Sequence, residues 1–194
     1  DAIRDAGGDD VCAVMLELVQ GEGGVYPMER EFVHQLAVLC AENDWLLLVD
    51  EVQTGIGRTG TLFAYQQYGI LPDVVSFAKG IGGGLPLGGI LANEKCRNVL
   101  HATTFGGNPV SCAGGCAVLE QLGDDVLEEV KIKGELIRDY IEGMHSPYVA
   151  GVRGLGLMIG VQLTGISHKE LAQRCIDRGL LVLTAGTDTL RLLP

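Results

Sequence analysis

Apolar residues in the first half of the chain follow two alternating patterns. Short apolar runs predict buried strands, and longer stretches with apolar positions three and four residues apart predict helices. The expected order is strand, helix, strand, short helix and two more strands, over 11–19, 27–43, 45–49, 62–68, 73–78 and 88–92. This alternation predicts an α/β fold with a mostly parallel sheet covered by helices.

From Pro109 onwards the pattern changes to long helical stretches followed by short strands. The helices are expected at 109–122, 124–144 and 169–178, and the strands within 149–163, broken at Gly154 and Gly156, and at 180–183 and 190–192. We place a domain boundary near residue 120. Residues 1–120 would form part of a large domain, and residues 121–194 would form a small α+β domain.

Composition and charge exclude several classes of partner. Hydrophobic residues make up 47% of the 194 residues, enough for a folded core. The formal net charge of −11 repels nucleic acids and anionic membrane surfaces, so we expect neither as a partner. No apolar run reaches the roughly 18 residues of a membrane span, and no signal peptide is visible. Cys112 and Cys116 have no accompanying His or second pair, so we expect no metal site, and reduced thiols in a cytoplasmic protein.

One candidate site follows the strand expected at 45–49, where the apolar run meets Asp50 and Glu51. Ligands bind beyond the carboxyl ends of parallel strands, so an acid here is placed to meet a positively charged group of a ligand. Two further interpretations stay open. The two carboxylates could simply cap a turn, or they could form the Walker B strand of an ATPase. The latter needs a Gly-x-x-x-x-Gly-Lys-Ser/Thr loop, which this sequence lacks.

A second candidate site follows the strand expected at 73–78, which leads into Lys79 and the glycine-rich segment 80–84. A lysine at the end of an apolar strand would be desolvated, which lowers its pKa and makes its amine nucleophilic. The alternative is a lysine that extends into solvent.

The two candidate sites are most informative together. Roughly 30 residues separate Asp50 from Lys79, about the length of one strand–crossover–strand unit, so both should emerge at the same edge of the sheet. An amine that forms a Schiff base and an acid that faces a pyridinium nitrogen are the two groups that pyridoxal phosphate requires. The pair therefore predicts a pyridoxal-phosphate enzyme.

The sequence resembles the class III (ornithine-type) aminotransferases, which have pyridoxal-phosphate fold type I. The resemblance covers nearly the whole chain, and the order and spacing of its motifs are specific. These motifs are Gln20–Gly24, Asp50–Gly55, Gly57–Gly60, Ser76–Gly80, Thr103–Pro109 and Leu190–Pro194. Within the family, the resemblance is greatest to members that act on N-acetylornithine in arginine biosynthesis.

The resemblance implies a role for each matching residue at the cofactor. Lys79 would be the catalytic residue and would hold pyridoxal 5'-phosphate, and Asp50 would pair with its ring nitrogen. Val52 would pack on one face of the ring, and Gln53 would bond its phenolic oxygen. Thr104 would reach the phosphate of the neighbouring subunit's cofactor, which implies a homodimer.

Two further residues would bind the substrate. Arg191 would clamp the α-carboxylate as a two-pronged ion pair. Glu22 would shield Arg191, so that one site accepts both an ω-amine and an α-amino acid. Without the resemblance, the sequence around Arg191 is typical of a charged surface residue, and that around Glu22 is typical of a turn.

The sequence departs from the family in two respects. Glu17-Leu18 stands where the family has Glu-Pro, which would alter a local turn. The chain begins at Asp1 and ends at Pro194, and a full member is roughly twice as long. We therefore expect a fragment with an incomplete small domain that lacks the N-terminal half, including one phosphate-binding loop. Such a fragment should be inactive alone.

The resulting hypothesis is transamination between N-acetylornithine, or a similar ω-amine, and 2-oxoglutarate, which yields the semialdehyde and glutamate. Ornithine, succinylornithine and 4-aminobutyrate are alternative donors, and glutamate-1-semialdehyde chemistry fits the segment Gln20–Gly24 less well. A Walker-B-type ATPase and an inactive aminotransferase remnant remain possible functions of a different class.

Overall fold

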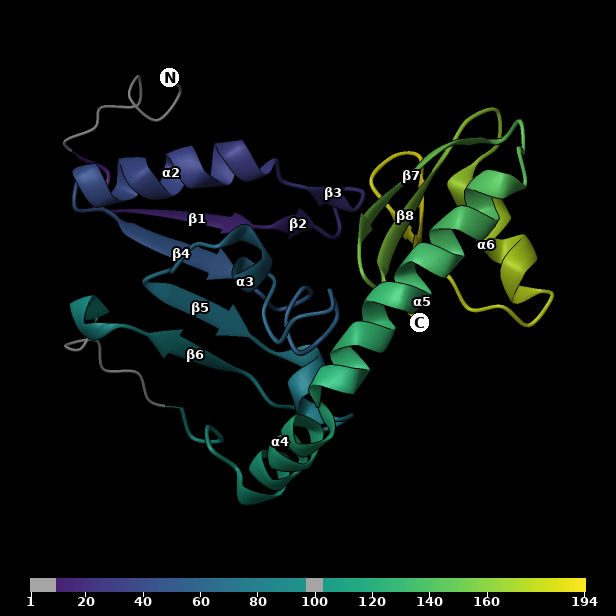
Figure 1. Ribbon diagram of the computed structural model, residues 1–194. Helices are drawn as coiled ribbons and strands as arrows, with labels where there is room; N and C mark the ends of the chain where they lie inside the picture. The colour runs from purple at the N-terminus through teal and green to yellow at the C-terminus, as the bar shows by residue number, and fades with distance from the viewer. Residues whose placement is uncertain (1–9, 97–102) are drawn as a thin grey trace.

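The computed structural model describes residues 10–96 and 103–194. Its large sheet has the strand order β1 (Ala13–Glu17), β4 (Leu46–Asp50), β5 (Val74–Phe77) and β6 (Gly89–Ala92). The first three strands are parallel, and β6 is an antiparallel edge strand, so the predicted mostly parallel sheet is confirmed. In Figure 1 the arrowheads of β1, β4 and β5 all point toward a second, smaller sheet.

Helix α2 (Arg30–Glu42) covers this sheet through one apolar face. Its buried residues Leu36 and Cys40 pack with Trp45 and Leu47 at the start of β4. The helix begins three residues later than the sequence pattern predicted. Tyr26–Pro27 instead forms β3, which pairs with β2 (Val19–Gln20), and this pairing leaves Pro27 outside the helix.

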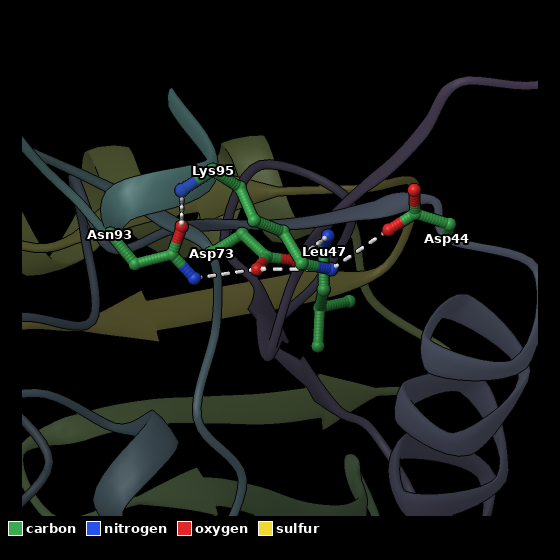
Figure 2. A network of polar contacts seen from close by, with 5 residues as sticks. All are labelled: Asp44, Leu47, Asp73, Asn93 and Lys95. Atoms are coloured by element: carbon green, nitrogen blue, oxygen red, sulfur yellow. Dashed lines mark hydrogen bonds and ion pairs between the residues drawn. The ribbon is translucent and has the colours of Figure 1, made fainter. Parts of the chain in front are cut away.

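Figure 2 shows a polar network at the end of the large sheet where β4 and β5 begin. Asp73 Oδ2 accepts the backbone N–H of Leu47 at 2.8 Å, and Asp73 Oδ1 accepts Asn93 Nδ2 at 2.6 Å. Lys95 lies 3.5 Å from Asp44 and 3.7 Å from Asp73. The carboxylate of Asp73 thereby connects three neighbouring strands and helps to set their register.

The small sheet is antiparallel, with the order β7 (Val149–Leu155), β8 (Met158–Leu163), β10 (Thr189–Leu192) and β9 (Leu183–Ala185). Helix α6 (His168–Ile176) packs on it, around a core that includes Ile159, Val161 and Leu190. The predicted strand at 180–183 is wrong. Leu180 and Leu181 are exposed in the segment that follows a turn at Gly179, and β9 begins only at Leu183.

Two helices connect the sheets. Helix α4 (Pro109–Gln121) starts at Asn108, whose side chain accepts the N–H groups of Val110 and Ser111, and it packs against η2 (Lys79–Gly82). The longer helix α5 (Asp124–Gly143) runs from α4 to the small sheet (Figure 1) and packs on β7 and β8. We propose the domain boundary near residue 120 on this division of contacts between α4 and α5.

The remaining described elements are the short helices α3 (Tyr65–Tyr68) and η3 (Glu94–Cys96). Tyr68 of α3 is buried, and its hydroxyl donates to the carbonyl oxygens of Leu18 and Met28. In the described ranges, 10–96 and 103–194, no helix combines the length and the apolar character needed to cross a membrane.

Candidate active site

A pocket of about 300 Å³ lies at the carboxyl edge of the large sheet, where the small sheet faces it. In the strand register, Glu17 pairs with Asp50 and Asp50 pairs with Ser76. The carboxyl ends of β1, β4 and β5 therefore lie next to one another along the same edge of the sheet. Segments that are distant in the chain line this pocket. They contribute Glu22, Val52, Gln53, Gly55, Ile56, Arg58, Lys79, Gly80, Leu183, Arg191 and Leu193.

Lys79 enters the pocket from an abrupt turn of the backbone after β5. Ala78 is still extended, but Lys79 has a positive φ of 53°. Ile56, also in the pocket lining, has a φ of 55°. Such left-handed conformations are unfavourable for residues with a side chain and cluster at functional sites. Both residues are therefore held in strained conformations at the pocket wall.

The side chain of Lys79 is exposed in the pocket. Of the two interpretations of the sequence, a desolvated amine and a lysine that extends into solvent, the exposure of Lys79 agrees with the second. The chain leaves the sheet at the turn formed by Ala78 and Lys79. The exposed glycines that follow have no side chains that could cover the Lys79 amine.

Asp50 ends β4, two residues before Val52, and is not itself among the residues that line the pocket. Its Oδ1 accepts the backbone N–H of Val52 at 2.9 Å and the hydroxyl of Ser76 at 3.3 Å. Ser76 lies on β5 shortly before Lys79, so Asp50 and Lys79 flank the same edge of two adjacent strands. The predicted convergence of Asp50 and Lys79 therefore agrees with the strand register.

Glu22, Gln53 and Arg191 form a three-way polar contact inside the pocket. Arg191 Nη1 donates to Glu22 Oε1 at 2.7 Å and to Gln53 Oε1 at 3.1 Å. Gln53 Nε2 donates to Glu22 Oε1 at 3.1 Å. A Cβ at Gly21 would lie 2.5 Å from Gln53 Oε1, so a side chain at position 21 would displace the end of the Gln53 side chain from this contact. The predicted proximity of Glu22 to Arg191 is confirmed by this ion pair.

The two residues of this ion pair, Arg191 and Glu22, differ in burial. The side chain of Arg191 is 7% exposed, whereas that of Glu22 is 73% exposed. The hydrogen bond from Arg191 holds the pKa of Glu22 below its usual 4.5, with smaller contributions from the Arg191 charge and from Gln53. Among the described residues, Arg191 Nε is buried without a hydrogen-bond partner. Arg191 is therefore a buried cation that retains one free donor beneath a displaceable carboxylate.

Glu51 has a different role from Asp50. It is fully buried, and its carboxylate accepts the N–H of Tyr65 at 2.8 Å and the hydroxyl of Thr54. Burial raises the pKa of Glu51, although these hydrogen bonds oppose the shift. The turn-capping interpretation thus holds for Glu51, which fastens the loop that carries Val52 and Gln53.

Several pocket residues were not predicted. Arg58 is the most notable, since its Nη1 donates to Pro194 O at 2.6 Å and to Leu157 O at 3.3 Å. Its only sequence signal was its place in the motif Gly57–Gly60. Leu193 likewise had only its place in the motif Leu190–Pro194, and Leu183 had no signal, because apolar residues at the ends of short strands are common.

Two predicted site residues, Asp50 and Thr104, do not line this pocket, and Thr104 also lies on a different segment of the chain. It belongs to the exposed segment 103–107 before α4. Within the described part of the chain, no group of three or more His, Cys, Asp or Glu side chains is placed to hold a metal ion.

The family model and the similar curated proteins all belong to the aminotransferases. The family model described as "Aminotransferase class-III" matches residues 1–194. Acetylornithine aminotransferase of Caldanaerobacter subterraneus subsp. tengcongensis is 43% identical over 201 residues, which cover 100% of this chain and 51% of that protein. Acetylornithine aminotransferase of Haemophilus ducreyi is 47% identical over 191 residues, covering 96% and 48%. The chain thus spans about half the length of these curated relatives.

Solved structures agree with these matches. The crystal structure of N-acetylornithine aminotransferase from Stenotrophomonas maltophilia superposes with a TM-score of 0.91 and 37% identity. The superposition covers 100% of this chain and 53% of that one.

Proposed function

Because this chain belongs to the class-III aminotransferase family, we propose that the protein transfers amino groups with pyridoxal 5'-phosphate. The donor would be N-acetylornithine or a similar ω-amine, and the acceptor would be 2-oxoglutarate, which becomes glutamate. This reaction would serve arginine biosynthesis in the cytoplasm. The relatives named acetylornithine aminotransferase support this choice of donor.

The pocket residues fit the cofactor. The exposed amine of Lys79 is free to form a Schiff base, and Val52 offers an apolar side chain to one face of a flat ring. Within residues 10–96 and 103–194, Asp50 forms its two hydrogen bonds through Oδ1, so Oδ2 would be available to a pyridinium nitrogen. When bound, pyridoxal phosphate acts as the electron sink for the substrate carbon that loses a proton. The Lys79 amine would hold the cofactor and would also carry that proton.

The observation that carries this proposal is the pairing of Arg191 with Glu22 in the same pocket as Lys79. An α-amino acid brings a carboxylate, which would replace Glu22 on Arg191 and use its spare Nε donor. An ω-amine brings no carboxylate to this position, and Glu22 would then neutralise Arg191. One site would thereby serve both halves of a transamination.

Thr104 supports a homodimer as part of this proposal. Because it is exposed and lies outside the pocket of its own chain, it is free to reach a cofactor phosphate in a neighbouring subunit. The predicted partners are therefore a second copy of the chain and small amino and oxo acids.

An ATPase and an inactive remnant are both less consistent with the pocket. A Walker B glutamate would face a nucleotide, whereas Glu51 is fully buried under Thr54 and Tyr65. In an inactive remnant we would expect some of the residues with predicted roles to be replaced. Lys79, Gln53 and Arg191 are all present in one pocket, and Asp50 is present at the end of β4.

The test uses the full-length protein with pyridoxal phosphate. We expect a visible absorption band that borohydride abolishes, with the reduced cofactor attached to Lys79 in mass spectrometry. Glutamate formation from 2-oxoglutarate would then be measured with N-acetylornithine, ornithine, succinylornithine and 4-aminobutyrate. The Lys79→Ala variant should lose both band and turnover. Absence of turnover with every donor in the wild type would refute the proposal.

A further inference from the structure

Arg153 of β7 connects the small sheet to the loop that carries Glu22. Its Nε donates to the carbonyl oxygen of Gly24 at 2.9 Å. Its guanidinium also lies over the ring of Tyr26, 3.9 Å from the centroid. A cation at this distance from an aromatic face is attracted to it. The loop is therefore held at two adjacent points by one side chain from a distant part of the chain.

The same guanidinium also binds the strand that carries Arg191. Arg153 Nη2 donates to Thr189 Oγ1 at 2.7 Å, and Nη1 donates to Gln162 Oε1 at 3.2 Å. Asp188 closes the network, since it accepts Thr189 Oγ1 and Gln162 Nε2, each at 2.9 Å. Thr189 is fully buried, whereas Arg153, Gln162 and Asp188 are partly buried.

These contacts link the segments that carry Glu22 and Arg191, in addition to the bond from the Gly186 N–H to the Glu22 carbonyl at 2.8 Å. Glu22 precedes Gly24 by two residues, and Arg191 follows Thr189 by two residues on β10. Side chains two apart on a strand share a face, so Arg191 and Thr189 point to the same side. A single guanidinium thus bridges the two segments close to the ion pair, although Arg153 itself is not among the residues that line the pocket.

The loop needs such a tether because its backbone is strained. Val25, a β-branched residue, has a φ of 58°, a left-handed conformation that is unfavourable for its side chain. A Cβ at Gly160 of β8 would lie 2.8 Å from Val25 Cβ, which shows how closely the small sheet approaches. Strained conformations of this kind persist only where the surroundings hold them.

We propose that Arg153 is a specificity-determining positioning residue, which holds Glu22 over Arg191 and thereby sets the preference for ω-amine donors. The inference rests on the proposed function. Without Arg153 the loop relaxes, and Glu22 neutralises Arg191 less completely. The half-reaction with an ω-amine then slows, whereas the half-reaction with glutamate, in which Glu22 must move aside, is retained.

The test measures both half-reactions separately in the full-length, cofactor-loaded protein, with N-acetylornithine and with glutamate. The Arg153→Met variant keeps the length of the side chain and removes its hydrogen bonds. We expect the ratio of kcat/KM for N-acetylornithine to kcat/KM for glutamate to fall about tenfold, as for the loss of one charge-assisted hydrogen bond. Arg153→Lys keeps the charge over Tyr26, and its ratio of the two kcat/KM values should lie between that of Arg153→Met and that of the wild type. Glu22→Gln removes the carboxylate that neutralises Arg191, and its ratio of the two kcat/KM values is the reference for complete loss of this neutralisation.

Arg138 offers a matched control. It is also partly buried, and its Nη2 donates to a β7 carbonyl, that of Gly154, at 3.1 Å. Because Arg138→Met removes an arginine bound to the same strand without touching the Glu22 loop, both half-reactions should change together. A merely structural role for Arg153 would give the same parallel change, and this result would overturn the proposal.

A second readout does not depend on activity. Hydrogen exchange of the backbone amides in 20–27 should accelerate in Arg153→Met and stay unchanged in Arg138→Met. If Arg153→Met does not fold, Thr189→Val removes one partner of the guanidinium and is tested in the same two ways. A wild type without turnover would refute the proposed function, and unchanged exchange in 20–27 would refute the tether.

Discussion

The carboxylate of Glu51 and the backbone N–H of Tyr65 are joined at 2.8 Å across the loop that carries Val52 and Gln53. Thr54 binds the same carboxylate from within the loop. A fully buried acid thus organises the loop between β4 and α3, while the adjacent Asp50 remains next to the pocket.

Replacement of Glu51 should destabilise the protein. Glu51→Ala leaves the Tyr65 N–H and the Thr54 hydroxyl buried without partners, and we expect a loss of roughly 2–4 kcal/mol in the free energy of unfolding. Glu51→Gln keeps an acceptor for Tyr65 and should lose about 1 kcal/mol. Denaturant titration of the full-length variants measures both. Equal losses in the two variants would contradict this role of Glu51.

The pH dependence of stability follows from the raised pKa of Glu51. Because burial raises it above the usual 4.5, the folded protein holds this proton to higher pH than the unfolded protein does. The contribution of Glu51 to stability is then complete below pH 4.5 and declines as the pH rises through the folded pKa. The Gln variant does not titrate. The stability of the wild type relative to Glu51→Gln should therefore decrease as the pH rises above 4.5, and an increase would reverse the assignment.

Arg191→Lys should weaken the binding of α-carboxylates. Lysine keeps the charge but lacks the planar fork and the spare Nε donor. We expect KM for glutamate to rise about 10- to 100-fold, with a smaller effect on N-acetylornithine. Steady-state kinetics of the full-length enzyme measures both. Arg174→Lys, an exposed pair with Glu170, is the control and should leave both values unchanged.

Arg58→Met should loosen the contact between the two sheets. Arg58 Nη1 holds the carbonyls of Leu157 and Pro194, and the N–H of Leu157 donates to the carbonyl of Arg58. Loss of the side-chain bonds should lower the free energy of unfolding by about 1–3 kcal/mol. Denaturant titration measures this loss. Arg178→Met, which removes an exposed arginine with one bond to a backbone carbonyl, should have little effect in the same titration.

Asp73→Ala should reduce stability without changing catalysis, because Asp73 and Leu47 lie where β5 and β4 begin, whereas the pocket residues Val52 and Lys79 follow the ends of these strands. The Leu47 N–H and Asn93 amide would lose their acceptor, with a loss of about 1–3 kcal/mol. Asp44→Asn removes only an exposed ion pair to Lys95 and should lose less than about 0.5 kcal/mol. A changed kcat/KM in Asp73→Ala would show that strand register reaches the active site.

The sequence by itself determined the elements of the large sheet and the edge at which Asp50 and Lys79 emerge. Apolar runs are local signals, and the length of one crossover unit was enough to bring two strand ends together. It also led to the pairing of Glu22 with Arg191, but only through resemblance to a family, because neither residue has a distinctive local pattern.

Only the tertiary structure decided how the two sheets meet. The roles of Arg58 and Arg153 depend on backbone carbonyls supplied by distant segments, and any residue type can supply a carbonyl. The exposure of Lys79 depends on a turn with positive φ, which its apolar surroundings in the sequence do not indicate. Such contacts arise from the packing of one unit against another, and hydrophobic periodicity along the chain carries no information about them.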